Sequence, residues 1–334
     1  MMNPMLASVA FAIAAACAGL MGFAIQRGAT CTVAAMEEVV RKRAFTRLGS
    51  MIEASLWVLG GLLLAQTLHI LGKMPAGYAT TWMTIVGGAL LGVGAFVNGA
   101  CVFGAIARLG SGEWAYLATP LGFYVGCLSE GTAGFAPAQQ TLPFGSPILH
   151  LPGLLALAFI GWMLVRIVRA IRDARAEAPA GFAAAMRHAL TNGVWSPRGA
   201  TTVIGITFVV LLVLTGAWAY TDVLAELARG MAGNLVARSV LVLALLLGAV
   251  IGGWTAGRFR STRVTLVQLA KCFAGGVLMG WGSLLIPGSN DGLILIGMPL
   301  LWPYAWVAFA TMCVTIGAAQ WGQRALAPRA LRSG

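Results

Sequence analysis

Six cysteines carry the most distinctive chemistry in this sequence. None is spaced as C-x-x-C, and in a chain of 334 residues that number and spacing argue against a disulfide framework and against a zinc site. No metal site is expected. Two cysteines, Cys31 in ATCTVAAMEE and Cys101 in NGACVFG, stand just before helix-compatible runs and are predicted to be functional. The other four are interpreted as small buried apolar side chains: Cys17, Cys127, Cys272 and Cys313.

The position of Cys31 and Cys101 leaves two kinds of chemistry open. A helix N-terminus favours the thiolate, whereas apolar burial favours the neutral thiol. A thiolate could attack a sulfur electrophile but would repel an anion, whereas a neutral S–H group is a weak, soft donor suited to a sulfur-bearing anion. Because burial of a negative charge already opposes an anion within a membrane, neutral thiols are the favoured interpretation.

Several polar residues near these cysteines and near a third Gly/Pro-containing break are predicted to contact a substrate. The predicted binding residues are Gln26, Arg27, Thr30, Asn98 and Asn290, and Ser289 is a candidate beside them, whose role as a third relay group is implied only by the family resemblance described below. Simpler interpretations stand beside these. Thr30 and Ser289 are also good N-cap residues, and Arg27 is equally a topogenic charge near the membrane surface.

Other titratable residues receive no catalytic role. Glu37 and Glu38 precede Arg41 and Lys42 by four residues, the spacing of helix-surface ion pairs. Lys271 lies inside an apolar run, where an ionisable side chain is by default a candidate functional residue. Its place near the predicted inner surface weakens this interpretation. The three histidines have no partner ligands in the sequence: His69, His150 and His188. No nucleotide, haem or H-E-x-x-H motif is present, so no cofactor is expected.

The composition predicts the elements that position these residues. The chain is 59% apolar and only 10% charged, which excludes an ordinary soluble enzyme and indicates an all-α polytopic membrane protein. Since about 20 apolar residues cross a bilayer, nine spans are predicted. They fall near 6–25, 51–71, 78–95, 113–133, 151–168, 201–220, 238–257, 264–283 and 303–322.

The net charge of +12 gives the predicted orientation. Most Lys and Arg residues fall in connectors that lie on one side, and only Lys73, Arg229 and Arg238 fall on the other. The positive-inside rule then places the N-terminus outside and the C-terminus inside. The basic connector before residue 200 is predicted to be an amphipathic segment at the inner surface.

An internal repeat divides the predicted spans into two halves. GGALLGVGAFVNGACVFG from Gly87 matches GGVLMGWGSLLIPGSNDG from Gly275 at an offset of 188 residues. Five spans separate the partners, so the halves are expected to have opposite orientations. The predicted organisation is a first repeat over 1–150, a linker span and connector over 151–200, and a second, inverted repeat over 201–334.

Three segments are too polar or too short to be spans and are interpreted as re-entrant. They cover 26–43, 97–112 and 285–298. Non-helical backbone at membrane depth is tolerated where it lines a cavity, so three such segments predict a central one. The helix N-termini are expected deepest, at Thr30 and Cys31, at Cys101 and at Ser289 to Asp291, where free N–H groups favour an anion.

The stretches GFAIQRGATC, GALLGVGAFVNGACVFGAIARLGSGE and GGVLMGWGSLLIPGSNDGLIL resemble the YeeE/YedE family of bacterial thiosulfate transporters over nearly the whole chain. The resemblance implies an hourglass-like fold and passage of thiosulfate between cysteines through S–H hydrogen bonds. It also implies a cytoplasmic sulfur-carrier partner of the TusA-like or rhodanese kind. Two of the three family cysteines fall on Cys31 and Cys101. Where the third is expected, this chain has Gly288, Ser289, Asn290 and Asp291.

The predicted function is therefore import of a small sulfur-containing anion, thiosulfate above all, without enzymatic chemistry. Ser289 could still donate a hydrogen bond to an anion, but Asp291 disfavours a dianion unless it is paired or turned away. Two alternatives stay open at this stage. One is a membrane thiol enzyme or persulfide carrier that hands sulfur to a soluble partner, and the other is a scaffold that transports nothing.

Overall fold

The computed structural model describes residues 8–72, 74–134, 139–151, 153–177, 194–230, 235–326. The described chain is helical throughout, without a β-strand and with one isolated bridge between Tyr78 and Thr141. It is an all-α membrane protein. Large apolar side chains are exposed along its helices, among them Leu243, Leu247 and Trp254 on one helix, as a lipid-facing surface requires.

The long helices account for every predicted span. They are α1 (Val9–Gly28), α3 (Thr46–Thr67), α4 (Trp82–Asn98), α6 (Ala118–Ala133), α7 (Gly153–Glu177), α9 (Pro197–Thr215), α11 (Leu235–Thr255), α12 (Leu266–Leu285) and α14 (Pro303–Leu326). By length and apolarity, six candidate spans are present among the described residues, or seven if a bent pair is one span. The count of nine stays a prediction.

Four short helices lie among the long ones. They are α2 (Thr32–Lys42), α5 (Val102–Gly110), α10 (Tyr220–Ala228) and α13 (Asn290–Gly292), which continues into a π-helical turn, η4 (Leu293–Gly297). Two 3₁₀ turns, η2 (Trp114–Leu117) and η3 (Pro147–His150), complete the described elements. Three of the short helices occupy the predicted re-entrant segments. The fourth, α10, lies within residues that the sequence analysis treated as the end of a span and its connector.

The breaks before two of these helices lie inside candidate spans. Val9–Lys42, which joins α1 and α2, forms one span of 34 residues, and Trp82–Gly110, which joins α4 and α5, forms one of 29. At the third break α12 and α13–η4 meet at a bend of 50°. The re-entrant interpretation of the three segments stays a prediction.

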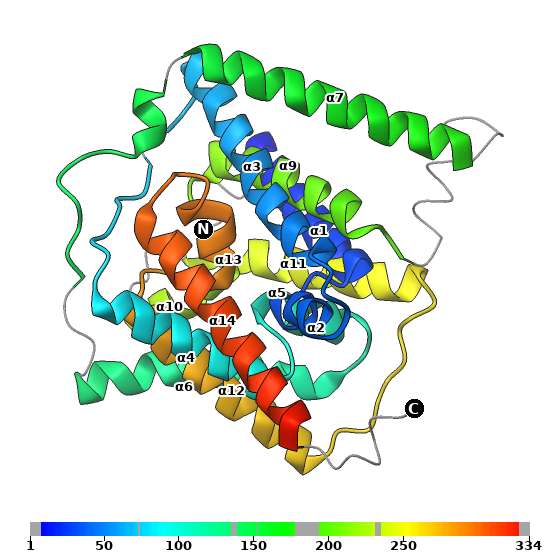
Figure 1. Cartoon of the computed structure of the whole chain (residues 1–334), viewed down its shortest axis with the longest axis vertical. Coiled ribbons are helices and arrows are strands. Elements are labelled where there is room, and N and C mark those ends of the chain that lie inside the picture. Colours follow the sequence, from blue (N-terminus) through cyan, green and yellow to red (C-terminus); the bar gives the residue numbers. More distant parts are fainter. Residues whose placement is uncertain are drawn as a thin grey trace.

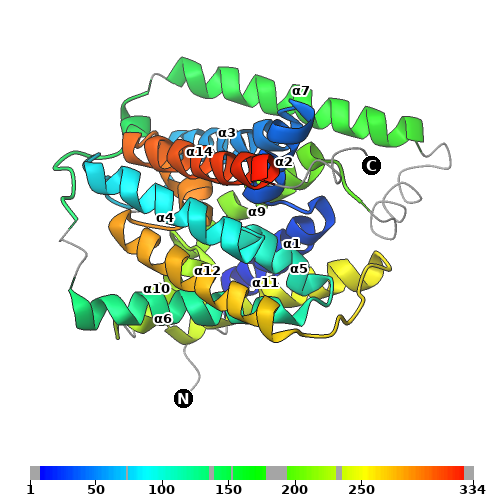
Figure 2. The same cartoon turned by 60° about the horizontal axis from the view of Figure 1, so that its bottom comes forward.

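The long helices pack in pairs that mirror the internal repeat. α1 contacts α11 as α9 contacts α3, and α4 contacts α14 as α12 contacts α6 (Figure 1). α10 packs on α6 as α2 packs on α14. α7 lies along one side of the bundle, outside this pairing, and contacts α3 (Figure 2). These matching contacts are the kind that two copies related by a twofold axis produce.

Glycines allow the central helix pair, α4 and α12, to approach closely. A Cβ on Gly87 would lie 2.9 Å from the carbonyl oxygen of Gly282, and a Cβ on Gly94 would lie 2.8 Å from that of Gly275. Since the contacts run in opposite order along the two helices, α4 and α12 are antiparallel. The glycines that revealed the repeat are therefore the ones on which its two copies meet, by the close approach that small residues permit in membrane proteins.

The surface charges follow the sequence analysis in part. Glu37 pairs with Arg41 at 3.1 Å, as predicted. Glu38 instead accepts a hydrogen bond from the backbone N–H of Arg47 and lies 3.9 Å from its Nε, so the predicted pair with Lys42 is wrong. Lys271 is exposed on α12. Lys73, His188, the basic tail and most of the predicted amphipathic connector lie outside the described residues.

Candidate functional site

Cys31 and Cys101 hold the same structural position, the N-cap of a short helix that follows a break. Cys31 precedes α2 with extended backbone angles, φ −157° and ψ 127°, and Cys101 precedes α5 with φ −75° and ψ −178°. Each break begins with a left-handed residue, Ala29 at φ 46° and Gly99 at φ 75°. Neither thiol makes a side-chain capping bond in its own helix, so simple capping does not explain either cysteine.

The two thiols lie against each other. The backbone N–H of Thr32, the residue after Cys31, donates to the sulfur of Cys101 at 3.1 Å, and the two side chains are close enough to interact. Cys101 is fully buried, whereas Cys31 is half-buried, and no cysteine of the chain is in a disulfide. Gly104 makes room for the pair, because a Cβ there would lie 2.4 Å from the Cys31 sulfur. The sequence analysis did not select Gly104. Its one signal in the sequence is its position three residues after Cys101.

Asn98, predicted to bind substrate, is committed to the break itself. Its Nδ2 donates to the carbonyl oxygen of Ala100 at 2.6 Å, and its Oδ1 accepts from the hydroxyl of Thr119 at 2.9 Å. The side chain is fully buried. Asn98 therefore holds the backbone in front of Cys101, and its contacts are those of a positioning residue.

Ser289 is the N-cap residue of α13 at the third break. Its hydroxyl is buried and has no hydrogen-bond partner, and it makes no capping bond in its own helix. The residue before it, Gly288, has φ 116°, which an L side chain rarely adopts. Burial of a hydroxyl without a hydrogen-bond partner costs free energy, so its presence here favours a ligand that forms a hydrogen bond with it.

The residues next to Ser289 connect the third break to the first. Asn290 donates from Nδ2 to the hydroxyl of Thr32 at 3.5 Å, and its Oδ1 has no partner. Asp291 accepts from the hydroxyl of Thr221 on α10 at 2.6 Å and from the backbone N–H of the same residue at 3.5 Å. Asp291 is thus directed toward α10 and hydrogen-bonded there, although a hydroxyl does not neutralise its charge.

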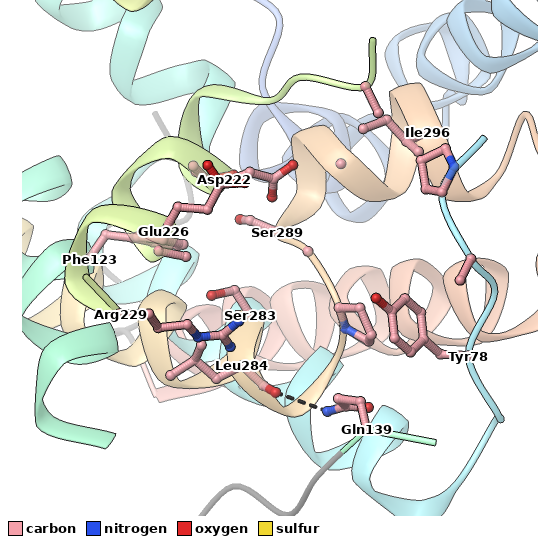
Figure 3. A pocket seen from close by; sticks show the side chains of 18 of the residues that line it. Tyr78, Phe123, Gln139, Asp222, Glu226, Arg229, Ser283, Leu284, Ser289 and Ile296 are labelled. Atoms are coloured by element: carbon pink, nitrogen blue, oxygen red, sulfur yellow. Dashed lines mark hydrogen bonds between the residues drawn. The ribbon is translucent and has the colours of Figure 1, made fainter. Parts of the chain in front are cut away.

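A cavity of about 640 Å³ leads to this break from the side predicted to face outward (Figure 3). Ser289, Ser283 and Gly288 line it on one wall, and Asp222, Glu226 and Arg229 line it on α10 and just after it. Gln139 borders the same cavity and donates to the carbonyl oxygens of Leu284 and Leu285 at 2.9 and 2.6 Å. The cavity brings together polar groups that the sequence alone could not associate, because α10 was not recognised.

Gln26, Arg27 and Thr30 lie at the end of α1, away from this cavity. Gln26 is buried and donates from Nε2 to the Ser111 hydroxyl at 3.3 Å, while its Oε1 has no partner. Arg27 is fully buried, donates to the Thr255 hydroxyl at 2.8 Å and stacks on the ring of Phe23.

Arg27 is thus enclosed by protein, and its alternative role as a topogenic charge stays a prediction. Thr30 is buried one residue before Cys31, which is the N-cap, so the prediction of Thr30 as the cap is wrong by one residue.

The remaining cysteines have the surroundings of packing residues. Cys127 contacts the carbonyl oxygen of Gly280 at 3.8 Å and the Ser283 hydroxyl at 4.0 Å, and Cys272 is buried beside Gln268. Among the described residues no cluster of three His, Cys, Asp or Glu side chains could hold a metal ion. The site is thus built from two thiols, one free hydroxyl and amide groups.

Comparison with known proteins identifies the family. A family model described as sulphur transport matches residues 27–318. The chain belongs to this family. It is also 23% identical over 331 residues to the thiosulfate transporter TsuA of Escherichia coli (strain K12), over 91% of this chain and 92% of that protein. The protein is accordingly a multi-pass membrane transporter for sulfur compounds and not an enzyme, and the resemblance expected from the sequence is confirmed.

Proposed function

We propose that this transporter imports thiosulfate through hydrogen bonds donated in turn by Ser289, Cys101 and Cys31. The observation that carries the proposal is that hydrogen bonds connect the three breaks. Asn290 at the third break donates to the hydroxyl of Thr32, and the backbone N–H of Thr32, next to Cys31, donates to Cys101. In this arrangement polar groups from both halves of the chain meet at Thr32. The name of the relative, a thiosulfate transporter, supports thiosulfate as the anion.

The physical reason for thiols is the nature of the substrate. The terminal sulfur of thiosulfate is a soft acceptor, and an S–H group is a weak, soft donor that can exchange partners easily. A dianion that leaves water loses strong hydration, so each stage needs a donor ready to replace it. A strong binding site would trap the anion, whereas weak donors in series allow it to move on.

We propose that the anion enters from the cavity at Ser289 and leaves past Gln26 and Arg27 toward the cytoplasm. Both residues are buried, and they precede Cys31 by five and four residues in the sequence. Arg27 supplies a positive charge on that side. The direction rests on the positive-inside rule, with the N-terminus periplasmic, the C-terminus cytoplasmic and a bacterial inner membrane as the location. The proposed architecture is one repeat over 1–150, a linker over 151–200 and an inverted repeat over 201–334.

The experiment is uptake of radiolabelled thiosulfate into proteoliposomes. Cys31→Ala and Cys101→Ala are each expected to lower the initial rate about 10- to 100-fold, because a hydrogen bond to a charged group contributes about 1.5–3 kcal/mol. Cys272→Ala is the matched control, since it removes a thiol that is equally buried and is expected to keep the wild-type rate. Wild-type rates in both site variants would refute the relay.

A covalent route is the second candidate, and the contact between the two thiols is the observation that favours it. In that route a cysteine thiolate would attack the terminal sulfur of thiosulfate, so that the S–S bond of thiosulfate breaks, sulfite leaves and a cysteine persulfide forms. The outer sulfur would then pass to the thiol of a soluble acceptor, for which a TusA-like or rhodanese carrier in the cytoplasm is proposed, and the cysteine thiol would be restored. Mass spectrometry of the purified protein after turnover decides between the routes. An additional sulfur atom on Cys31 or Cys101 supports the carrier, and unmodified thiols support the hydrogen-bond relay.

A further inference from the structure

The cavity at Ser289 contains more negative groups than an anion path requires. Asp222 and Glu226 on α10 line it, Glu130 on α6 lines it on another side, and Asp291 lies just behind Asp222. The guanidinium of Arg238 is committed to Glu226, with which it forms an ion pair. Among the described residues the carboxylate of Asp222 makes neither an ion pair nor a hydrogen bond, although it is half-buried.

The groups around Asp222 come from every element packed on α10. They are Glu130 and Cys127 from α6, Arg238 from α11, Asp291 from α13, Tyr304 from α14, and Tyr220, Glu226 and Arg229 from α10 and the residue after it. Asp291 and Glu226 are the two carboxylates whose negative charges act most strongly on Asp222. Two arginines also lie near Asp222, and one of them, Arg238, is already paired with Glu226. A carboxylate placed beside other carboxylates that is not paired with a cation binds a proton more readily than one that is.

We propose that Asp222, together with Asp291, binds a proton that this transporter carries inward with each anion. The proposal rests on the proposed uptake function and deepens it by naming the co-transported ion. The proton comes from the water of the outer cavity and is released to the water inside, and no bond to the anion and no electron transfer is involved. An interior-negative membrane potential opposes entry of a dianion, and each proton carried cancels one of its charges.

The geometry links the proton site to the anion path. Figure 3 shows Asp222 and Ser289 facing the same space from opposite walls, and the Ser289 hydroxyl is buried without a partner. Behind them Asp291 is bonded to Thr221, and the hydroxyl of the adjacent Tyr220 reaches the carbonyl oxygen of Val102, next to Cys101, at 3.5 Å. Asp222 thus lies in the same cavity as Ser289, and the helix that carries Asp222 also contacts the break at Cys101.

A proton fits this cluster better than a metal cation. Among the described residues no group of three or more His, Cys, Asp or Glu side chains is arranged to hold a metal ion. Sodium would need several oxygen ligands around one point. Asp291 already uses both of its carboxylate oxygens on Thr221. A single carboxyl group suffices for a proton.

The test uses the full chain in proteoliposomes that contain a pH-sensitive dye. Addition of thiosulfate outside is expected to acidify the lumen of wild-type vesicles, and each proton carried raises the steady-state accumulation about tenfold per imposed pH unit. Asp222→Asn keeps the shape of the side chain and is expected to abolish this dependence. Glu37→Gln, which removes an exposed carboxylate paired with Arg41, is the control and is expected to keep it.

Three results separate the outcomes. Uptake of thiosulfate without lumen acidification in the wild type, or a dependence on sodium in place of pH, overturns the proton proposal and leaves the proposed function intact. Retention of the full pH dependence in Asp222→Asn also overturns it. Absence of thiosulfate uptake in the wild type under every gradient contradicts the proposed function itself.

Discussion

The break at Cys101 and the break at Ser289 are equivalent positions of the repeat, since they lie 188 residues apart, and they differ in what their side chains do. Cys101 accepts from an amide of the first break and touches its thiol. The Ser289 hydroxyl has no partner and faces a cavity. One copy of the motif closes on its own half and the other lines a cavity. This difference supports the proposed roles, contact with the incoming anion for Ser289 and passage through the middle for the thiols.

The same offset identifies a fourth break. Ala219 lies 188 residues after Cys31, and it is the N-cap of α10 as Cys31 is the N-cap of α2. In the first half an amide at one break contacts a thiol at the other. In the second half the corresponding link is made by Asp291 and Thr221. Thiols thus join the breaks of one half, and a carboxylate joins those of the other.

The largest effect is expected from filling the space beside the thiols. Gly104→Ala places a methyl group 2.4 Å from the Cys31 sulfur, so one thiol has to move. Uptake is expected to fall about as far as in Cys31→Ala, 10- to 100-fold, through loss of a hydrogen bond to the anion. Gly161→Ala, on α7, meets no atom within 4 Å and is the control. A wild-type rate in Gly104→Ala would show that the thiol pair does not depend on this contact.

A smaller effect is expected at the cavity, where variants of Ser289 test how the two breaks differ. Ser289→Ala removes the unpartnered hydroxyl and is expected to lower initial uptake about tenfold, the effect of one hydrogen bond to a charged group. Ser289→Cys makes the second copy resemble the first and is expected to retain more activity than Ser289→Ala. Equal rates in the two variants would mean that Ser289 does not donate to the anion.

The smallest effect is expected at the contact between the halves. Asn290→Ala removes a long hydrogen bond of 3.5 Å to Thr32 and leaves that hydroxyl its contact with the Met51 sulfur. Uptake is expected to fall about threefold, because a neutral hydrogen bond contributes about 0.5–1.5 kcal/mol. Thermal unfolding of the detergent-solubilised protein is the accompanying measurement. A large loss of stability without loss of rate would make Asn290 purely structural.

Much of this architecture could be predicted from the sequence because apolar run length and glycine spacing are local signals. Each predicted span coincides with a helix, and the breaks at Cys31, Cys101 and Ser289 lie where Gly, Pro and polar residues interrupt apolar runs. The helix α10 escaped prediction because Gly216, which ends α9, was interpreted as part of a span over 201–220. Nor could the sequence show that Asn98 faces Thr119 or that Asp291 faces Thr221, since those contacts depend on packing between distant segments.

The most direct test of the central claim is protection of the thiols by substrate. A small methanethiosulfonate reagent is applied to the membrane-embedded protein with and without thiosulfate, and modification of each cysteine is followed by mass spectrometry. Saturating thiosulfate is expected to slow modification of both Cys31 and Cys101, while sulfate, a dianion without the terminal sulfur, protects less. Unchanged modification rates at both cysteines in saturating thiosulfate would contradict passage of the anion between them.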